Sequence, residues 1–175
     1  MAVYTSIDNP ELYFQTKTYT GNGTAIGSGG QAITLDGDED MQPDWVWIKD
    51  RSDSDRPRMF DVIRGVTKEL DTSDTTGETT LTEGLTTFGS DGFTVGNHEG
   101  VNSNTDSFVA WCWKAGGSGS SNTDGSINTT STSANTTSGF SINTFTGTQQ
   151  VGTIGHGLGS TPGVLIVKNT AASSD

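Results

Sequence analysis

The chain has 175 residues, 30% of them hydrophobic, and a formal net charge of −12. This composition approaches that of disordered chains, but 4 Trp, 3 Tyr and 7 Phe residues, bunched in short alternating segments, supply apolar area for a folded core. The acidic balance excludes a basic surface that follows phosphates, so nucleic acid is not an expected partner, and the longest apolar run, residues 108–113, is too short for membrane insertion.

The first predicted strands lie before residue 40. In residues 17–23, Tyr19 alternates with flanking threonines, and an Asn-Gly turn signal follows at the end of the segment. This pattern predicts a strand that enters a hairpin. Residues 32–35 are interpreted as a second short strand. The acidic run at residues 36–40 follows it and is typical of a polar turn.

Two segments are predicted to be central strands, because both of their faces are apolar. In residues 44–49 the two tryptophans share one face, and the two aliphatic residues share the other. Residues 107–114 alternate in the same way, and they also carry two tryptophans. A strand that is apolar on both sides belongs inside a sandwich. The predicted core residues are Trp45, Trp47, Ile48, Phe88, Phe93, Trp111 and Trp113.

The segments between the central strands give weaker signals. Residues 50–58 are interpreted as a charged loop, while the apolar spacing in residues 59–70 fits both a helix and a strand that stops at Gly65. Residues 85–95 have a Gly-Ser-Asp-Gly sequence between two phenylalanines, which predicts two short strands joined by a tight turn. Strands at intervals of about ten residues predict an all-β protein, a β-sandwich or jelly roll with little helix.

Composition divides the chain into three predicted regions. Residues 1–115 form the β-sandwich module and hold most of the charged side chains. Residues 116–138 contain almost only Gly, Ser, Thr and Asn, which predicts a linker or an extended arm. Residues 139–175 are interpreted as the start of a second, incomplete β unit.

An internal repeat identifies this second unit. Thr-Tyr-Thr-Gly at residues 18–21 reappears as Thr-Phe-Thr-Gly at residues 144–147, and Pro-Asp-Trp-Val-Trp-Ile-Lys at residues 43–49 reappears as Pro-Gly-Val-Leu-Ile-Val-Lys at residues 162–168. Because an isolated two-strand unit is marginal in water, either the unit belongs to a longer multi-module protein or a neighbouring subunit completes its sheet. Together with the arm, the predicted assembly contacts are Thr144, Phe145, His156, Val164 and Ile166.

Seven strings of the sequence resemble one family of bacteriophage virion proteins common in marine phages. They are PDWVWIKDR at 43–51, FDVIRGVTKEL at 60–70, SDGFTVG at 90–96, FVAWCWKAGG at 108–117, NTDGSI at 122–127, GFSI at 139–142 and VGTIGHGLGSTP at 151–162. The resemblance implies tail-fibre-like appendage proteins with concanavalin-like β-sandwich modules, located in the virion and oligomeric, with a trimer favoured. It also implies a part in host attachment, and it favours a strand at residues 60–64.

An acidic cluster is the one candidate metal site in the sequence. Asp36, Asp38 and Asp40 have the first spacing of a calcium loop, but Met41 and Trp47 occupy the positions of the turn glycine and the bidentate glutamate. A solvated turn is the preferred interpretation, and a hard-cation site at these three residues is the alternative.

The candidate catalytic groups lack the spacing that chemistry requires. His98 and His156 lie in no metal-ligand motif, and Cys112 is interpreted as a small buried residue of a strand. A single cysteine forms no intrachain disulfide, which favours folding in a reducing compartment. The sequence also has no nucleophile elbow and no phosphate-binding loop, so neither an enzyme activity nor a cofactor is expected.

The residues and the resemblance together predict a non-enzymatic virion structural protein. It is expected to be a tail fibre, or the virion-attached part of a tail appendage, that binds other virion proteins. A capsid decoration protein is the alternative. A further alternative is a lectin-like module, in which exposed tryptophan faces stack on a host surface glycan.

Overall fold

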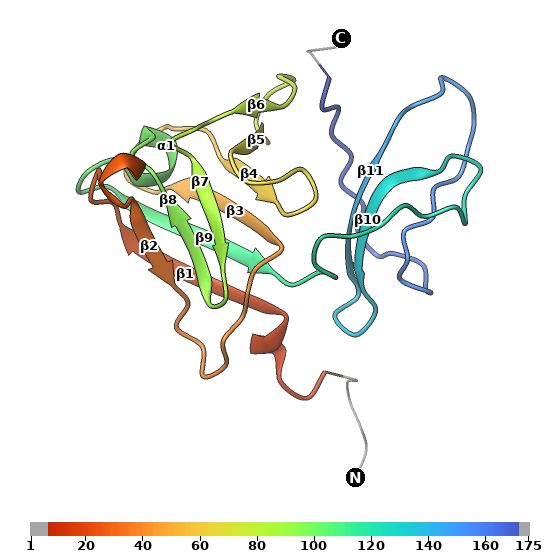
Figure 1. Cartoon of the computed structure of the whole chain (residues 1–175), viewed down its shortest axis with the longest axis horizontal. Coiled ribbons are helices and arrows are strands. Elements are labelled where there is room, and N and C mark those ends of the chain that lie inside the picture. Colours follow the sequence, from red (N-terminus) through yellow and green to blue (C-terminus); the bar gives the residue numbers. More distant parts are fainter. Residues whose placement is uncertain (1–6, 172–175) are drawn as a thin grey trace.

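Two antiparallel sheets form the first part of the chain (Figure 1). The structure is a computed structural model, and it describes residues 7–171. The larger sheet has the strand order β1 (Phe14–Thr20), β9 (Ser107–Trp113), β3 (Trp45–Asp50), β4 (Arg58–Asp61), β5 (Lys68–Asp71) and β6 (Thr79–Thr80). The smaller sheet has the order β2 (Gln31–Thr34), β8 (Gly92–Val95) and β7 (Leu85–Gly89). The predicted all-β sandwich is therefore confirmed.

Helix is a minor part of the described chain. A 3₁₀ turn, η1 (Pro10–Leu12), precedes β1, and a second 3₁₀ turn, η2 (Ile26–Ser28), and one short helix, α1 (Glu99–Asn102), lie between strands. His98 caps α1, because its side chain accepts a hydrogen bond from the backbone N–H of Gly100.

The hydrophobic core lies between the two sheets. Side chains alternate between the faces of a strand, so every second residue of β3 and β9 points toward the smaller sheet. This core includes Val46, Ile48, Phe60, Phe108, Ala110 and Cys112 from the larger sheet and Ile33, Leu85, Phe93 and Val95 from the smaller one. As the apolar pattern predicts, β3 and β9 are central strands, and β9 lies between β1 and β3.

The predicted hairpin after residues 17–23 is wrong, although the strand exists. β1 pairs with β9, and β2 pairs with β8 in the other sheet. The chain therefore crosses between the sheets where a hairpin turn was expected. Gly21 and Gly23 donate backbone hydrogen bonds to Asp106 and Asn102, so this crossing is fixed by the end of α1 and the loop before β9. Tyr19 stacks on Phe108, with ring centroids 5.2 Å apart.

The ambiguous segment at residues 59–70 contains two strand ends joined by turns and no helix. It contains the end of β4 and the start of β5, which pair with each other. The strand stops at Asp61 rather than continuing to Arg64, because the Asp61 carboxylate accepts hydrogen bonds from the backbone N–H groups of Ile63 and Arg64. The two predicted strands at residues 85–95 are β7 and β8, which pair antiparallel across a tight turn.

The segment predicted to be an arm forms a strand in its second half, and its first half is also hydrogen-bonded, as in the bridge between Ser120 and Thr132. Residues of strand β10 (Thr129–Asn135) pair antiparallel with β11 (Phe140–Phe145), and this hairpin lies beside the sandwich (Figure 1). β11 supplies the apolar side chains that the arm lacks, since Phe140 and Ile142 pack against the larger sheet. Composition alone predicts an arm at residues 116–138, because β11, the strand that pairs with β10, lies outside this Gly/Ser/Thr/Asn-rich segment.

Three of the predicted core residues are buried, and four are only half-buried. Trp45, Ile48 and Phe93 are buried, while Trp47, Phe88, Trp111 and Trp113 are intermediate in exposure. The tryptophans lie on the face of the larger sheet that is turned away from the smaller sheet. Hairpin β10–β11 covers part of this outer face through Phe140 and Ile142, so the sheet is apolar on both sides but its outer face is only partly buried.

Candidate functional site

Four tryptophans form a continuous aromatic surface on the outer face of the larger sheet. Strand register places Trp45 opposite Trp113 and Trp47 opposite Trp111. Ring centroids are 4.5 Å apart in the first pair and 5.6 Å apart in the second, and both pairs are tilted. Such offset aromatic pairs stabilise a sheet beyond the area that they bury.

Hairpin β10–β11 covers one end of this aromatic surface. The Phe140 ring lies 5.7 Å from that of Trp45 and 6.0 Å from that of Trp113. Because of this cover, Trp45 is only 8% exposed. The Trp47–Trp111 pair lies one step farther along the strands and stays half-exposed, with Trp47 Nε1 donating a 3.2 Å hydrogen bond to Thr72 Oγ1.

The C-terminal strip, defined as residues 164–167, is a second apolar surface. Its four side chains are Val164 (81% exposed), Leu165 (80%), Ile166 (65%) and Val167 (69%). In the described part of the chain, no strand pairs with these residues. Consecutive large apolar side chains at this exposure are typical of an association surface.

Residues just after the strip are attached to the sandwich. Lys168 Nζ donates a 2.6 Å hydrogen bond to the backbone oxygen of Asp74, and the backbone N–H of Glu78 donates one of 2.9 Å to Thr170. A Cβ at Gly77 would lie 2.0 Å from the Ala171 oxygen, so the loop between β5 and β6 accepts the C-terminal segment only with glycine at this position. The strip is thus tethered at one end.

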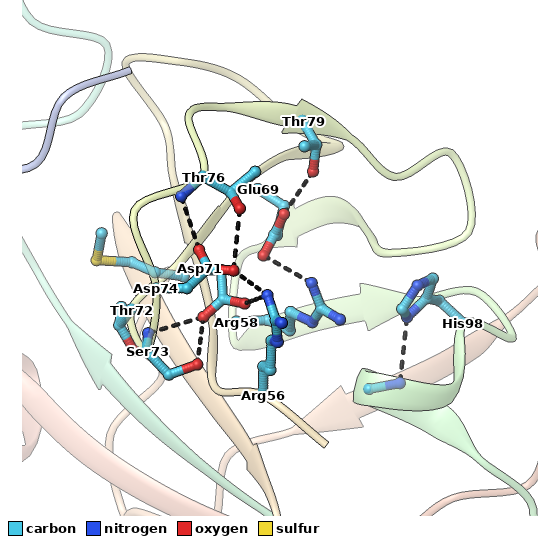
Figure 2. Close-up of polar contacts among 12 residues, drawn as sticks. Arg56, Arg58, Glu69, Asp71, Thr72, Ser73, Asp74, Thr76, Thr79 and His98 are labelled. Carbon is cyan, nitrogen blue, oxygen red and sulfur yellow. Dashed lines mark hydrogen bonds and ion pairs between the residues drawn. The ribbon is translucent and has the colours of Figure 1, made fainter. Parts of the chain in front are cut away.

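An ion-pair network shapes this loop (Figure 2). Arg56 Nη1 lies 3.1 Å from Asp71 Oδ2 and also pairs with Asp74. Asp71 Oδ1 accepts hydrogen bonds of 2.7 Å from both the N–H and the hydroxyl of Ser73, and Asp74 accepts the corresponding pair from Thr76. These local bonds hold the loop in the shape that receives Lys168.

The two carboxylates of the network are held in their charged forms. Burial alone would raise the pKa of Asp71, but the hydrogen bonds from Ser73 and the contact with Arg56 outweigh it and lower that pKa. For Asp74, the backbone N–H of Thr76 is the largest cause of a lowered pKa. Both groups are therefore ionised well below neutral pH.

A second ion pair lies next to the first (Figure 2). Arg58 Nη1 is 2.9 Å from Glu69 Oε1, and Thr79 donates a hydrogen bond of 2.5 Å to the other oxygen of Glu69. Burial and then the charge of Arg58 lower the pKa of His98. Its neutral ring suits its observed role, because Nδ1 must be unprotonated to accept from Gly100.

The acidic candidate metal site is a solvated turn. Asp36, Asp38 and Asp40 are exposed, and Asp36 pairs with Lys17 instead of with its neighbours. Within residues 7–171, no group of three or more His, Cys, Asp or Glu side chains is arranged to hold a metal ion. Cys112 is fully buried in the core, and this burial raises the pKa of its thiol to about 12.

Comparison with known proteins assigns the chain to a family. Residues 9–175 match the model of a family described as a domain of unknown function, DUF7483. The chain belongs to this family. No curated protein and no solved structure matches the chain. The matched region contains the sandwich, the hairpin and the C-terminal strip, so all surfaces described above belong to the family domain.

The predicted assembly contacts of this DUF7483 domain fall in three places. Val164 and Ile166 lie in the exposed strip. Thr144 and Phe145 end β11, where Thr144 is half-buried and Phe145 is 38% exposed. His156 is half-buried in a loop, and its Nδ1 accepts a hydrogen bond of 3.2 Å from the Leu158 N–H. The described contacts do not join it to the strip.

Sequence reasoning missed two features of the site. The first is Phe140, which covers part of the aromatic surface. The alternation of apolar residues in Gly-Phe-Ser-Ile at residues 139–142 could have indicated a strand with Phe140 on its apolar face. The loop that holds Lys168 lies almost a hundred residues earlier, and no sequence signal links the two. Among the described residues, no helix has the length and apolar character needed to cross a membrane.

Proposed function

We propose that the chain is a non-enzymatic structural module of a bacteriophage virion, from a tail fibre or the virion-attached part of a tail appendage. Its task is to join virion proteins through its C-terminal half. The observation that carries this proposal is the C-terminal strip, in which four consecutive large apolar side chains are 65–81% exposed. Burial of this surface against another protein would stabilise an assembly by the hydrophobic effect.

Charge distribution supports a joining role for this half. The charged side chains of residues 111–175 are only Lys114, Asp124, Lys168 and Asp175, although the whole chain has a net charge of −12. Like charges do not oppose close approach at this half, whereas the acidic sandwich keeps separate copies soluble. The surface that meets a partner thus lies in the half of the chain that has few charges and no net charge.

The surroundings of the reactive side chains support a role without catalysis. His98 and His156 each use Nδ1 to accept from a backbone N–H two residues later. The Cys112 thiol is buried and its pKa is raised, so the nucleophilic thiolate is disfavoured. These groups are used for local structure.

Labelling on intact particles tests the proposal. An antibody against the sandwich, visualised by electron microscopy on phage that encode this domain, is expected to mark the tail, with a small number of copies determined by quantitative mass spectrometry. Hundreds of copies on the head would instead assign the domain to capsid decoration, the alternative function. Absence from purified particles that contain the other virion proteins would overturn both assignments.

The half-exposed Trp47–Trp111 pair favours a second candidate function, which is recognition of a host surface glycan. Aromatic rings stack on the apolar faces of sugars, and these two rings lie 5.6 Å apart beyond the cover of Phe140. Titration with host glycans is expected to change tryptophan fluorescence in the parent chain and not in a Trp111→Ala variant. An unchanged spectrum of the parent chain at millimolar glycan would reject this function.

A further inference from the structure

The first module provides a template for the repeated segments. β9 lies between β1 and β3 and pairs antiparallel with both. Its register with β3 runs from Trp45 opposite Trp113 to Asp50 opposite Phe108. β1 and β3 are thus the two neighbours of β9 in the sheet, one on each edge.

The repeat supplies sequence counterparts of β1 and β3 in the second unit. Residues 144–147, at the end of β11, match the end of β1, and residues 162–168 match β3 with its preceding proline. In this alignment Val164 replaces Trp45 and Ile166 replaces Trp47, so the apolar character of both faces is retained. Among the described residues, no strand pairs with residues 164–167.

We propose that a neighbouring module in the assembly donates a strand of the β9 type, which lies antiparallel to the C-terminal strip. This inference rests on the proposed joining function and names the chemistry of the partner. The donated strand is apolar on both faces and uncharged, because a strip with large apolar side chains on both faces leaves no face for a polar neighbour. Strand addition of this kind combines main-chain hydrogen bonds with side-chain pockets.

Several features of the strip suit strand addition. None of residues 164–168 has a positive φ, so an L-residue strand forms there without backbone strain. Pro162 precedes the strip, and proline is tolerated at the start of a strand. Lys168 is already bonded to Asp74, which fixes one end of the strip and lowers the entropy lost on pairing.

The strand cannot come from β9 of the same chain. Both edges of that β9 are occupied, one by β1 and the other by β3, and its inner side chains are fully buried. Withdrawing it would unfold the sandwich. The donor is therefore a strand other than this β9, and it must present a free edge.

The test uses the full chain with a tail added after Asp175. The tail is a flexible Gly/Ser linker and a copy of β9 with alanine in place of its cysteine, and the linker raises the effective concentration of the strand to the millimolar range. A matched control tail carries serine at the positions of Phe108, Ala110 and Cys112. Hydrogen exchange of residues 164–168 is the readout in both chains and in the chain without a tail.

The β9 tail is expected to slow exchange in the strip by about tenfold or more, as pairing of a backbone amide does, and the control tail to leave it unchanged. Ile166→Lys in the tailed chain is expected to abolish the protection, while Thr161→Lys keeps it.

Equal protection by both tails, or by neither, would overturn the proposal. A dimer with a protected strip in the chain without a tail would also overturn it, since a second copy would then occupy the strip. Because particle labelling does not depend on this pairing, the joining function and the donated strand fail separately.

Discussion

Lys168 Nζ donates a 2.6 Å hydrogen bond to the backbone oxygen of Asp74, which lies 94 residues earlier in the chain. This bond links the C-terminal segment to the loop that follows β5. We expect Lys168→Ala to release the segment, so that the Glu78 amide, now bonded to Thr170, exchanges faster. Hydrogen exchange checks this. Lys17→Ala, which breaks a pair with exposed Asp36, is the matched control and should leave Glu78 unchanged.

The two tryptophan pairs should differ in their contribution to stability. Trp45 is 8% exposed and contacts Trp113 and Phe140. Its replacement by alanine is expected to lower the free energy of unfolding by about 3–5 kcal/mol, as for other buried large-to-small changes. Trp111→Ala, at a half-exposed position, is expected to cost about 1–2 kcal/mol, within the ordinary range of single substitutions. Denaturant unfolding measures both, and equal losses would contradict the division of the aromatic surface.

Phe140 should determine whether the hairpin stays on the sandwich. Its ring contacts both Trp45 and Trp113, whereas Phe145 on the same strand is 38% exposed. We expect Phe140→Ala to shift tryptophan fluorescence to longer wavelength, because two indole rings gain contact with water. Limited proteolysis in residues 116–138 should also become faster. Phe145→Ala is the control, and a red shift of the same size in that variant would contradict the assignment of the cover to Phe140.

Acid should loosen the loop that receives Lys168, and Asp71 should account for part of this effect. Its pKa is lowered in the folded chain, so the unfolded chain binds the proton first as the pH falls. The resulting stability is complete above the ordinary pKa of 3.8 and is lost as the pH falls through the lower folded value. Asp71→Asn is expected to flatten the dependence of the unfolding free energy on pH below about 4. Urea unfolding at several pH values checks this, and parallel curves for the two chains would contradict it.

Cys112 should react with thiol reagents only when the sandwich opens. Its side chain is fully buried, and burial raises its pKa to about 12, so the reactive thiolate is scarce at neutral pH. The labelling rate in the native chain is expected to rise with denaturant in parallel with unfolding. Fast labelling in buffer alone would mean that β9 opens locally.

Most of the sandwich follows from local sequence patterns. The two-faced apolar alternation of residues 44–49 and 107–114 identifies β3 and β9 as central, and the turn between residues 85 and 95 identifies β7 and β8. Local patterns do not determine pairing between distant strands. The prediction of a hairpin after residues 17–23 is wrong for this reason, because β1 pairs with β9, which lies far along the chain.

Exposure was harder to infer than strand position. Alternation shows that Trp47 and Trp111 lie on an apolar face, but the depth of burial depends on what covers that face. The cover is a short hairpin, one strand of which is composed mainly of Ser and Thr. The strip at residues 164–167 was found through the repeat, whereas its tether to Asp74 depends on a backbone oxygen, which no sequence pattern marks.

Insertion of β9 between β1 and β3 also sets the order in which the chain acquires its shape. The larger sheet has no continuous interior until residue 113 has left the ribosome, because β9 joins strands that are synthesised much earlier. Such high contact order slows folding. Until β9 is synthesised, β1 and β3 each have an unpaired edge, and such edges favour aggregation or chaperone binding of the nascent chain.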